Sequence, residues 1–325
     1  MTAPSNPRLP LLLPRRLQPG DTIGLFNPSG AIHERAPYAQ AHAALQALGF
    51  RTLEAPNLRA RWGHMAGTPQ QRADDLHALF ADPQVAGLLA VTGGSGANRV
   101  LPLLDYGLIA RHPKVLGGFS DLSALTNAVH ARTGLVSFHS PLARSEWNAF
   151  TVAQFKAVVM DGRAHAFCNE LSAGEALGAA EGRTTTIRGG RAQGPLLGGN
   201  LAVLTSLVGT PYLPDFEGAI LFLEDVNEYI YRVDRMLSTL MLAGVLARVA
   251  GVVLGGFTNC TVSEGSFGTL TLDEVFDDYF GGLGVPVYRG AQFGHVKRKF
   301  TLPLGVPAEI NADAGTLRLL QPAVS

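Results

Sequence analysis

Cysteine is scarce in this 325-residue chain, which contains only Cys168 and Cys260. Two cysteines so far apart in the sequence are too few for a disulfide scaffold or a zinc cluster. The histidines are also scattered, and neither His-x-x-x-His nor Cys-x-x-Cys spacing occurs. The sequence therefore predicts no metal site, and the low cysteine content fits a reducing compartment.

An excess of charge of either sign is also missing, because 26 Lys and Arg are balanced by 26 Asp and Glu. A formal net charge of zero argues against a broad electrostatic surface for nucleic acid or for anionic membrane. The apolar stretch 9–14 is broken by prolines and followed by Arg15 and Arg16, so it is too short for a signal sequence or a membrane helix. We expect residues 1–17 to form an irregular arm of a cytoplasmic protein that contacts neither nucleic acid nor membrane.

Strands alternate with helices in the first half of the chain. Apolar runs that end in turn residues predict strands over 21–26, 86–92, 115–117 and 135–138. Helical spacing predicts helices over 38–48, 70–80, 97–104 and 122–132, the second one starting at Thr68-Pro69. This order predicts a doubly wound parallel sheet, Rossmann-like or amidotransferase-like, in a domain over 18–160.

The second half begins with a stretch of different character. Residues 161–195 lose periodicity and are predicted to be a connector with a short hairpin. A second α/β domain over 196–325 follows, with strands over 219–224, 249–257 and 285–288, helices over 231–246 and 272–279, and a terminal β-hairpin. The fold class is therefore α/β with two domains.

Ser120 lies in the most informative segment, Lys114-Val-Leu-Gly-Gly-Phe-Ser-Asp-Leu-Ser123. A strand, two glycines, a serine and the start of a helix are the layout of a nucleophile elbow, although Leu122 replaces the second glycine of Gly-x-Ser-x-Gly. The other interpretation is that Ser120 caps the helix, since serine is a common N-cap residue.

A nucleophilic serine needs a base and a group that orients the base. Glu224 ends the apolar strand 220–223, and His295 lies just beyond the strand over 285–288. Because the carboxyl ends of parallel strands meet at one crevice, these groups are candidate partners of Ser120. The competing interpretations are a helix N-terminal charge for Glu224 and a solvated loop for His295.

The glycine loop Gly93-Gly94-Ser95-Gly96 follows a strand and precedes a helix. It lacks the Gly-x-Gly-x-x-Gly pattern and a P-loop lysine, so a dinucleotide or phosphate site is the weaker interpretation. An oxyanion hole made by the N–H groups of a loop glycine and of Asp121 fits better. Other candidates are His139 as a lining residue, Arg232 as the partner of a substrate carboxylate, and Cys260 as a rival nucleophile.

Several separate segments resemble one family. They include Gly118-Phe-Ser-Asp121, Gly198-Gly-Asn200, Leu223-Glu-Asp225, Tyr231-Arg-Val-Asp-Arg235 and Phe293-Gly-His295. In this order they resemble the LD-carboxypeptidase family of serine peptidases, which includes murein tetrapeptide carboxypeptidases and microcin-immunity hydrolases. The resemblance implies a catalytic triad of Ser120, Glu224 and His295, with an oxyanion hole at the backbone of Gly94 and Asp121. It also implies a homodimer, an active site between the domains, and no metal or cofactor.

One segment departs from the family pattern. Murein-type members usually carry Arg-Gly-Gly-Tyr-Gly in the oxyanion loop, whereas this chain has Thr92-Gly-Gly-Ser95-Gly. The backbone donors survive this change, but the substrate fit is altered, so Thr92 and Ser95 join the candidate substrate-binding residues. The leading hypothesis is a serine carboxypeptidase that cleaves the amide bond before a C-terminal D-amino acid. The alternatives are a microcin-immunity-type hydrolase of peptidyl- or aminoacyl-nucleotides and a non-catalytic ligand-binding module.

Overall fold

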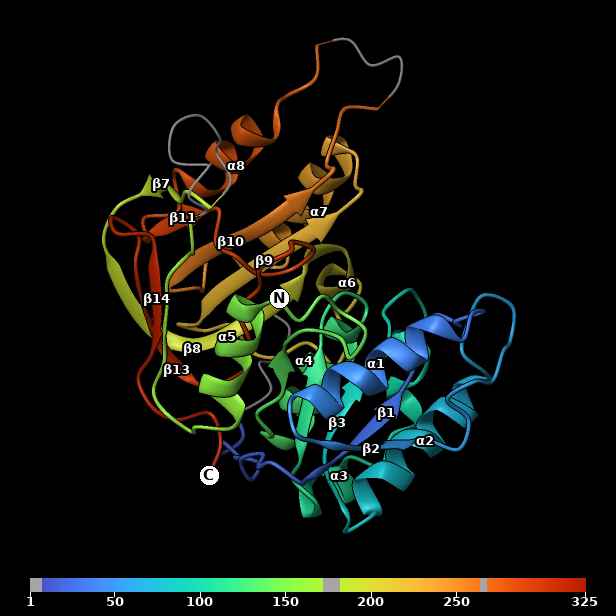
Figure 1. Cartoon of the computed structure of the whole chain (residues 1–325). Coiled ribbons are helices and arrows are strands. Elements are labelled where there is room, and N and C mark those ends of the chain that lie inside the picture. The colour runs from blue at the N-terminus through green and yellow to red at the C-terminus, as the bar shows by residue number, and fades with distance from the viewer. Residues whose placement is uncertain (1–7, 172–181, 264–267) are drawn as a thin grey trace.

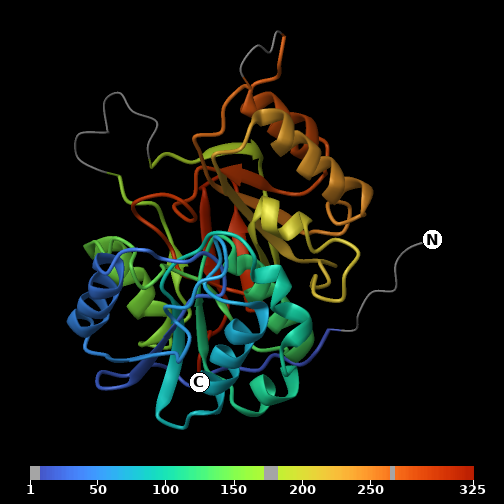
Figure 2. The same cartoon turned by 90° about the vertical axis from the view of Figure 1, so that its right-hand side faces the viewer.

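Two β-sheets, each with its own helices, build the protein. The structure is a computed structural model that describes residues 8–171, 182–263 and 268–325. Figure 1 shows the N-terminal half in blue to green beside the C-terminal half in yellow to red, and Figure 2 shows the same two lobes from the side. The predicted α/β class with two domains is confirmed. No helix in the described ranges is long and apolar enough to span a bilayer.

The first sheet has six strands in the order β12-β5-β4-β3-β1-β2. All neighbours are parallel except β12, which pairs antiparallel with β5. The strands are β1 (Thr22–Phe26), β2 (Arg51–Glu54), β3 (Val85–Ala90), β4 (Val115–Gly118), β5 (Phe138–His139) and β12 (Leu302–Pro303). Since β12 comes from the C-terminal part of the chain, the sheet unites segments on both sides of the expected boundary between 18–160 and 196–325.

The helices of the first half are α1 (Ala36–Ala47), α2 (Pro69–Ala81), α3 (Tyr106–Arg111), α4 (Leu122–Thr133) and α5 (Ala149–Val159). Helices α3 and α5 were not predicted. Helix α2 starts as its sequence predicts, since the Thr68 hydroxyl accepts from the Gln71 N–H in a capping box. The helix expected over 97–104 is wrong. Two 3₁₀ turns (Ala97–Arg99 and Leu101–Leu103) stand there instead, because Pro102 lacks the N–H that a continuous α-helix requires.

The second sheet has eight strands in the order β6-β14-β13-β8-β9-β10-β11-β7. They are β6 (Ala166–Phe167), β7 (Thr185–Arg188), β8 (Arg191–Asn200), β9 (Ile220–Val226), β10 (Gly251–Thr258), β11 (Val287–Arg289), β13 (Pro307–Asn311) and β14 (Thr316–Leu319). Strands β8 to β11 are parallel, and the flanking strands are antiparallel. The helices are α6 (Leu201–Thr205), α7 (Ile230–Leu242) and α8 (Leu272–Phe280).

The connector prediction over 161–195 is only partly right. Residues 172–181 lie outside the described residues, but β6 and β7 on either side of them pair with β14 and β11 at opposite edges of the second sheet. They do not pair with each other, so these two strands do not form the expected hairpin, and the rest of the segment lies outside the described residues. The terminal hairpin is confirmed as the antiparallel pair of β13 and β14.

Helix α4 joins the two sheets and thereby positions the candidate site. The Asn127 Nδ2 donates to the Gly198 carbonyl at 2.9 Å, and the Asn200 N–H donates to the Ser123 Oγ at 2.9 Å. A Cβ atom on Gly199 would lie 2.5 Å from that same Oγ, so only glycine allows the helix to approach β8 this closely. The helix that starts after Ser120 is therefore fixed against the strand next to β9, which carries Glu224.

Candidate active site

Ser120 lies at a strained turn between β4 and α4. Its backbone φ is +67°, in the left-handed region that serine seldom adopts. The position just before α4 is Asp121, and no side chain caps this helix. The interpretation of Ser120 as a helix cap is therefore wrong, and the backbone has instead the strain typical of a nucleophile elbow.

The elbow also explains why Leu122 is tolerated in place of the second glycine. A Cβ atom on Gly118 would lie 2.3 Å from the Leu122 Cδ2, and Gly118 has a φ of +150°. The leucine side chain thus occupies the space that the absent Cβ of Gly118 leaves free. Gly118 alone is enough for the turn, because the Leu122 side chain folds back over it.

The structure brings Ser120, His295 and Glu224 together from segments far apart in the sequence. The His295 Nδ1 lies 2.7 Å from the Glu224 Oε2, and the Nε2 lies 3.2 Å from the Ser120 Oγ. Both distances fall in the range for a nucleophile, a base and a group that orients the base. The His295 ring also contacts the edge of the Phe119 ring, with centroids 4.7 Å apart. The three side chains therefore form a continuous chain of polar contacts.

The approach of His295 to Glu224 depends on Gly294. This residue has a φ of +87°, and a Cβ atom on it would lie 2.4 Å from the Glu224 Oε2. On the other side of the histidine, the Thr258 hydroxyl donates to the His295 carbonyl at 3.0 Å. The backbone of His295 is thus fixed on one side by Gly294 and on the other by the hydroxyl of Thr258 at the end of β10.

Glu224 and Asp225 have different roles although they are adjacent. The Glu224 side chain is 0% exposed, and its Oε1 has no hydrogen-bond partner within the described ranges. Asp225 accepts from the Ala202 N–H at 2.9 Å and from the Asn200 Nδ2 at 3.0 Å, near the start of α6. Burial raises the pKa of Asp225 to about 6. Asp225, not Glu224, is therefore the charge at a helix N-terminus.

The glycine loop lies directly against the nucleophile. A Cβ atom on Gly93 would be 3.0 Å from the Ser120 Cβ and 3.1 Å from its Oγ, and Gly94, at a φ of +124°, approaches the backbone of Gly30. Within the part of the chain that the structure describes, no protein acceptor meets the N–H of Gly94 or of Asp121. Two backbone donors beside a serine hydroxyl are the arrangement that an oxyanion requires.

Arg72 holds this loop in place, and sequence reasoning did not single it out as a functional residue. Its side chain is buried, and its guanidinium donates to the carbonyls of Pro28 and Gly96, the latter at 2.9 Å. On the other side, the Asp121 carboxylate accepts from the Ala97 N–H at 2.8 Å, and burial raises the pKa of Asp121. The signal in the sequence was an arginine on the buried face of α2, which is apolar except for Arg72 and Asp75.

Two of the four substrate-binding candidates lie on the glycine loop. Thr92 is 7% exposed, and its hydroxyl accepts from the Arg144 Nε at 3.1 Å. Ser95 is exposed, and its hydroxyl lies 3.1 Å from the His64 Nε2. Thr92 thus contacts Arg144, which was not among the candidate residues, and Ser95 lies at the surface of the loop.

The other two candidates do not lie where a substrate would contact them. His139 is 3% exposed, its ring lies among Phe119, Phe222 and Phe293, and burial lowers its pKa to about 4. The expectation that His139 lines the site is wrong, because the strand end turns its ring into the aromatic layer beneath the triad.

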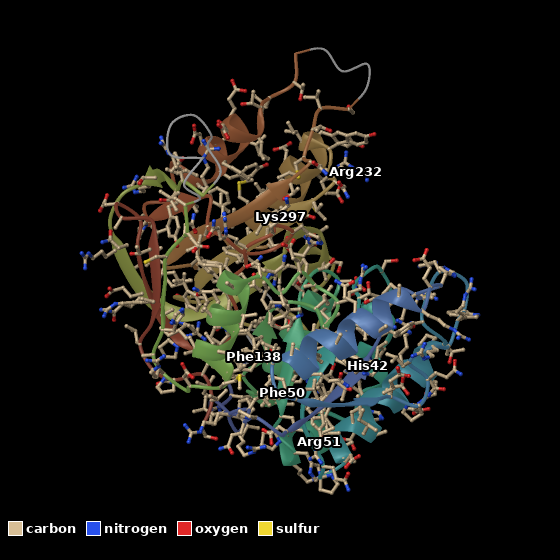
Figure 3. The ribbon with its side chains drawn as sticks, viewed as in Figure 1. His42, Phe50, Arg51, Phe138, Arg232 and Lys297 are labelled. Carbon is tan, nitrogen blue, oxygen red and sulfur yellow. The ribbon has the colours of Figure 1, made fainter. Side chains whose placement is uncertain are left out.

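Arg232 lies on the exposed face of α7, where Glu228 is 3.7 Å away and the Tyr231 hydroxyl is 3.2 Å away. Figure 3 shows it on the side of the C-terminal lobe, and it is not among the residues that line the pocket containing His295. The structure therefore does not bring Arg232 to the nucleophile.

A pocket of about 650 Å³ opens beside the candidate triad, and His295 forms part of its wall. Its charged and polar lining residues include Glu146, Asn148, Gln292 and Lys297. Cys260 does not line this pocket, and burial raises the pKa of its thiol, so it is a poor rival nucleophile. Within the described ranges no group of three His, Cys, Asp or Glu side chains could hold a metal ion.

Two family models and several known proteins match this chain over most of its length. The family model for the LD-carboxypeptidase N-terminal domain matches residues 23–140, and the model for the C-terminal domain matches residues 193–310. The chain is 34% identical over 308 residues to a probable murein peptide carboxypeptidase of Bacillus subtilis, covering 93% of this chain and 92% of that protein. It is 33% identical to the murein tetrapeptide carboxypeptidase of Pseudomonas aeruginosa over 79% of this chain and 82% of that protein.

The solved structures show the same likeness. The structure of MccF in complex with glutamyl sulfamoyl guanosine superimposes with a TM-score of 0.86 at 27% identity, covering 97% of this chain and 100% of that one. MccF is the microcin C7 self-immunity protein of Escherichia coli. Both family models and the curated relatives therefore lead to one conclusion: the chain belongs to the LD-carboxypeptidase family of hydrolases.

Proposed function

We propose that this protein is a serine carboxypeptidase that hydrolyses the amide bond before a C-terminal D-amino acid, as in the conversion of a murein tetrapeptide to a tripeptide. The observation that carries the proposal is the chain of contacts from Glu224 through His295 to Ser120, at 2.7 and 3.2 Å. Carboxypeptidases of murein peptides are among the similar proteins, which supports a peptide substrate.

In the first half of the reaction, the Ser120 Oγ attacks the carbonyl carbon while the His295 Nε2 takes its proton. Glu224 orients the ring through Nδ1 and stabilises the imidazolium that forms. The N–H groups of Gly94 and Asp121 donate to the oxyanion. His295 then gives its proton to the departing amine, and an acyl group remains on Ser120.

In the second half, water replaces the amine. His295 takes a proton from the water as its oxygen attacks the acyl carbon, and it returns this proton to the Ser120 Oγ when the ester bond breaks. The products are the shortened peptide and the free amino acid. One water molecule is consumed, and His295 ends in the protonation state in which it began, so the atoms and charges balance.

A second candidate function is the hydrolysis of an aminoacyl- or peptidyl-nucleotide. It is favoured by the likeness to MccF, which binds glutamyl sulfamoyl guanosine, and by a pocket of about 650 Å³ beside His295. The same serine, base and oxyanion donors would serve both reactions, because each one transfers an acyl group. The two functions differ only in the leaving group that the pocket accepts. A non-catalytic binding module would not need the strained φ of +67° at Ser120.

The test compares the wild-type protein with Ser120→Ala on three substrates: a murein tetrapeptide, a dipeptide with a D-terminus, and an aminoacyl sulfamoyl nucleoside. We expect the wild type to release D-alanine from the tetrapeptide and the variant to lose activity on the order of 10⁴-fold or more. Circular dichroism and the melting temperature verify that the variant is folded. Full activity of a folded Ser120→Ala would refute the mechanism, and cleavage of the nucleoside substrate alone would select the second function.

A further inference from the structure

Arg144 places a guanidinium beside the oxyanion loop. It lies in the loop that connects β5 to α5, and its side chain is exposed. The Nε donates to the Thr92 Oγ at 3.1 Å, and Thr92 itself is 7% exposed. The Arg144 guanidinium is thus hydrogen-bonded to the buried hydroxyl of Thr92, the residue directly before Gly93.

This anchor point is close to the reacting atoms. Gly93 lies against Ser120, since a Cβ atom on the glycine would be 3.1 Å from the Ser120 Oγ. In a carboxypeptidase substrate, the terminal carboxylate carbon is only about 2.5 Å from the amide nitrogen that leaves, because two covalent bonds separate them. A cation that recognises this carboxylate must therefore lie within a few ångströms of the elbow. Arg144 is hydrogen-bonded to Thr92, the neighbour of the glycine that lies against Ser120.

The remaining nitrogens of Arg144 are available for a ligand. Guanidinium has five N–H donors in a planar fork, and the contact with Thr92 uses only the Nε. Among the residues that the structure describes, no carboxylate or carbonyl accepts from its two terminal amino groups. A fork with one fixed nitrogen and two open ones suits a carboxylate, which it can bind through two parallel hydrogen bonds.

Other cations are less suited to this role. Arg72 is buried and donates to the Gly96 carbonyl, and Arg232 pairs with Glu228 on α7. Three cations line the pocket beside His295: Arg183, Lys297 and Arg298. Both arginines already interact with other groups of the protein, and Arg298 pairs with Glu170 at 3.2 Å. Lys297 is exposed, but its ammonium group binds as a point charge and not as a fork, and this lysine is included in the test as a competitor.

We propose that Arg144, anchored by Thr92, binds the free carboxylate of the substrate's C-terminal residue and so makes the enzyme an exopeptidase. The proposal rests on the proposed function, because it assigns a specificity-determining residue to the same site. It replaces Arg232, which the sequence alone favoured for this carboxylate. Arg144 takes no part in proton transfer; it positions the substrate so that its carbonyl faces Ser120.

The test measures kcat/KM for two peptides that differ only at the C-terminus, one ending in D-alanine and one in D-alaninamide. In the wild type we expect the acid to be preferred, and in Arg144→Gln we expect the ratio of acid to amide to fall about 10- to 100-fold. Arg144→Lys should recover only part of the ratio, because lysine cannot supply the fork. Thr92→Val keeps the cation but removes its anchor, and we expect a smaller fall that appears mainly in KM.

Arg232→Gln and Lys297→Met are the matched controls, and we expect both to keep the wild-type ratio. An unchanged ratio in Arg144→Gln, or an equal loss on both peptides, would overturn the proposal. A fall of the ratio in Lys297→Met instead would assign the carboxylate to that lysine and overturn it too.

A second measurement separates this inference from the proposed function. It compares the rates at which two serine-directed phosphonates label Ser120, one neutral and one with a carboxylate in the position of the leaving residue. We expect Arg144→Gln to slow labelling by the second reagent relative to the first, whatever peptide the enzyme cleaves. If the wild type cleaves neither peptide but this difference appears, the substrate is wrong and the role of Arg144 stands. If the difference is absent, the role of Arg144 is wrong.

Discussion

Replacement of Glu224 by glutamine separates the proposed catalytic role of this residue from its effect on stability. The side chain is 0% exposed, and one oxygen faces the His295 Nδ1 at 2.7 Å. The other oxygen has no hydrogen-bond partner within the described ranges. Glutamine has nearly the same shape, so Glu224→Gln removes the charge and changes little else.

The expected loss of activity follows from the geometry of the ring. If the amide oxygen faces the Nδ1, the imidazolium that forms in the transition state loses its counter-charge. If the amide nitrogen faces the ring, it favours the tautomer with the proton on the Nε2, which then cannot accept the proton of Ser120. Loss of the triad carboxylate costs about 10³- to 10⁴-fold in other serine hydrolases. We expect the same here, which corresponds to about 4–5.5 kcal/mol of transition-state stabilisation.

The same substitution should stabilise the fold. A buried carboxylate with a single partner is costly, because its second oxygen has given up water without gaining a donor. Removing the charge is expected to raise the free energy of unfolding by about 1–3 kcal/mol, or the melting temperature by roughly 2–6 °C. Steady-state kinetics and differential scanning calorimetry measure the two effects in the same preparation.

Glu309→Gln is the control for Glu224→Gln, because Glu309 pairs with Arg318 at 2.9 Å on the outer strands and should change neither quantity much. The reasoning would be refuted if Glu224→Gln kept more than about a tenth of the wild-type kcat/KM. A melting temperature that falls with the activity would show instead that the buried carboxylate stabilises the fold.

Two further predictions concern neighbouring residues. Gly294→Ala should lower kcat by about 10²-fold or more with little change in KM, because its Cβ would lie 2.4 Å from the Glu224 Oε2. Gly284→Ala is the control, because Gly284 has a φ of +78° but open space around its Cβ position. Equal losses of kcat in both variants would show that backbone strain alone, and not the contact with Glu224, causes the effect. Burial raises the pKa of Asp225 from 3.8 to about 6, so the folded state binds its proton more tightly than the unfolded state does. The protonated side chain therefore contributes its full share to the free energy of unfolding below pH 3.8, and this contribution is lost as the pH rises through 6. In urea titrations, the stability of wild type relative to Asp225→Asn should fall by about 1 kcal/mol per pH unit between these values, and a constant difference would contradict the shift.

The sequence predicted those elements whose signals are local. Helix α2 has a capping threonine and a proline at its start, and β3 is an apolar run long enough for a buried strand. Strand β2 was missed because it is a half-exposed edge strand of four residues. Strand β8 was missed because its ten residues begin with a polar, exposed half in the connector and end in two glycines. Gly198 lies against the backbone of β9, and Gly199 admits α4. Both strands form through pairing and packing with partners that are far away in the chain, so their own residues do not predict them.

The family resemblance could not reveal which side chains surround the nucleophile. His139 and Arg232 were plausible from their positions after a strand and on a helix, but one turns into the core and the other outward. Packing between elements decides whether a side chain is buried and which way it points. The local pattern of polar and apolar residues does not reveal this.

The altered oxyanion loop illustrates the point most clearly. From the sequence, threonine at position 92 meant the loss of an arginine and an altered substrate fit. In the fold, Arg144 reaches the hydroxyl of this same threonine from a loop 52 positions later in the chain. A threonine can anchor a guanidinium that an arginine in the loop would repel. The substitution in the loop is therefore compatible with carboxylate recognition, provided that the cation is supplied by the β5–α5 connection. Whether a change at Thr92 weakens the enzyme thus depends on whether Arg144 is present, and the double variant Thr92→Val with Arg144→Gln should lose no more discrimination than Arg144→Gln alone.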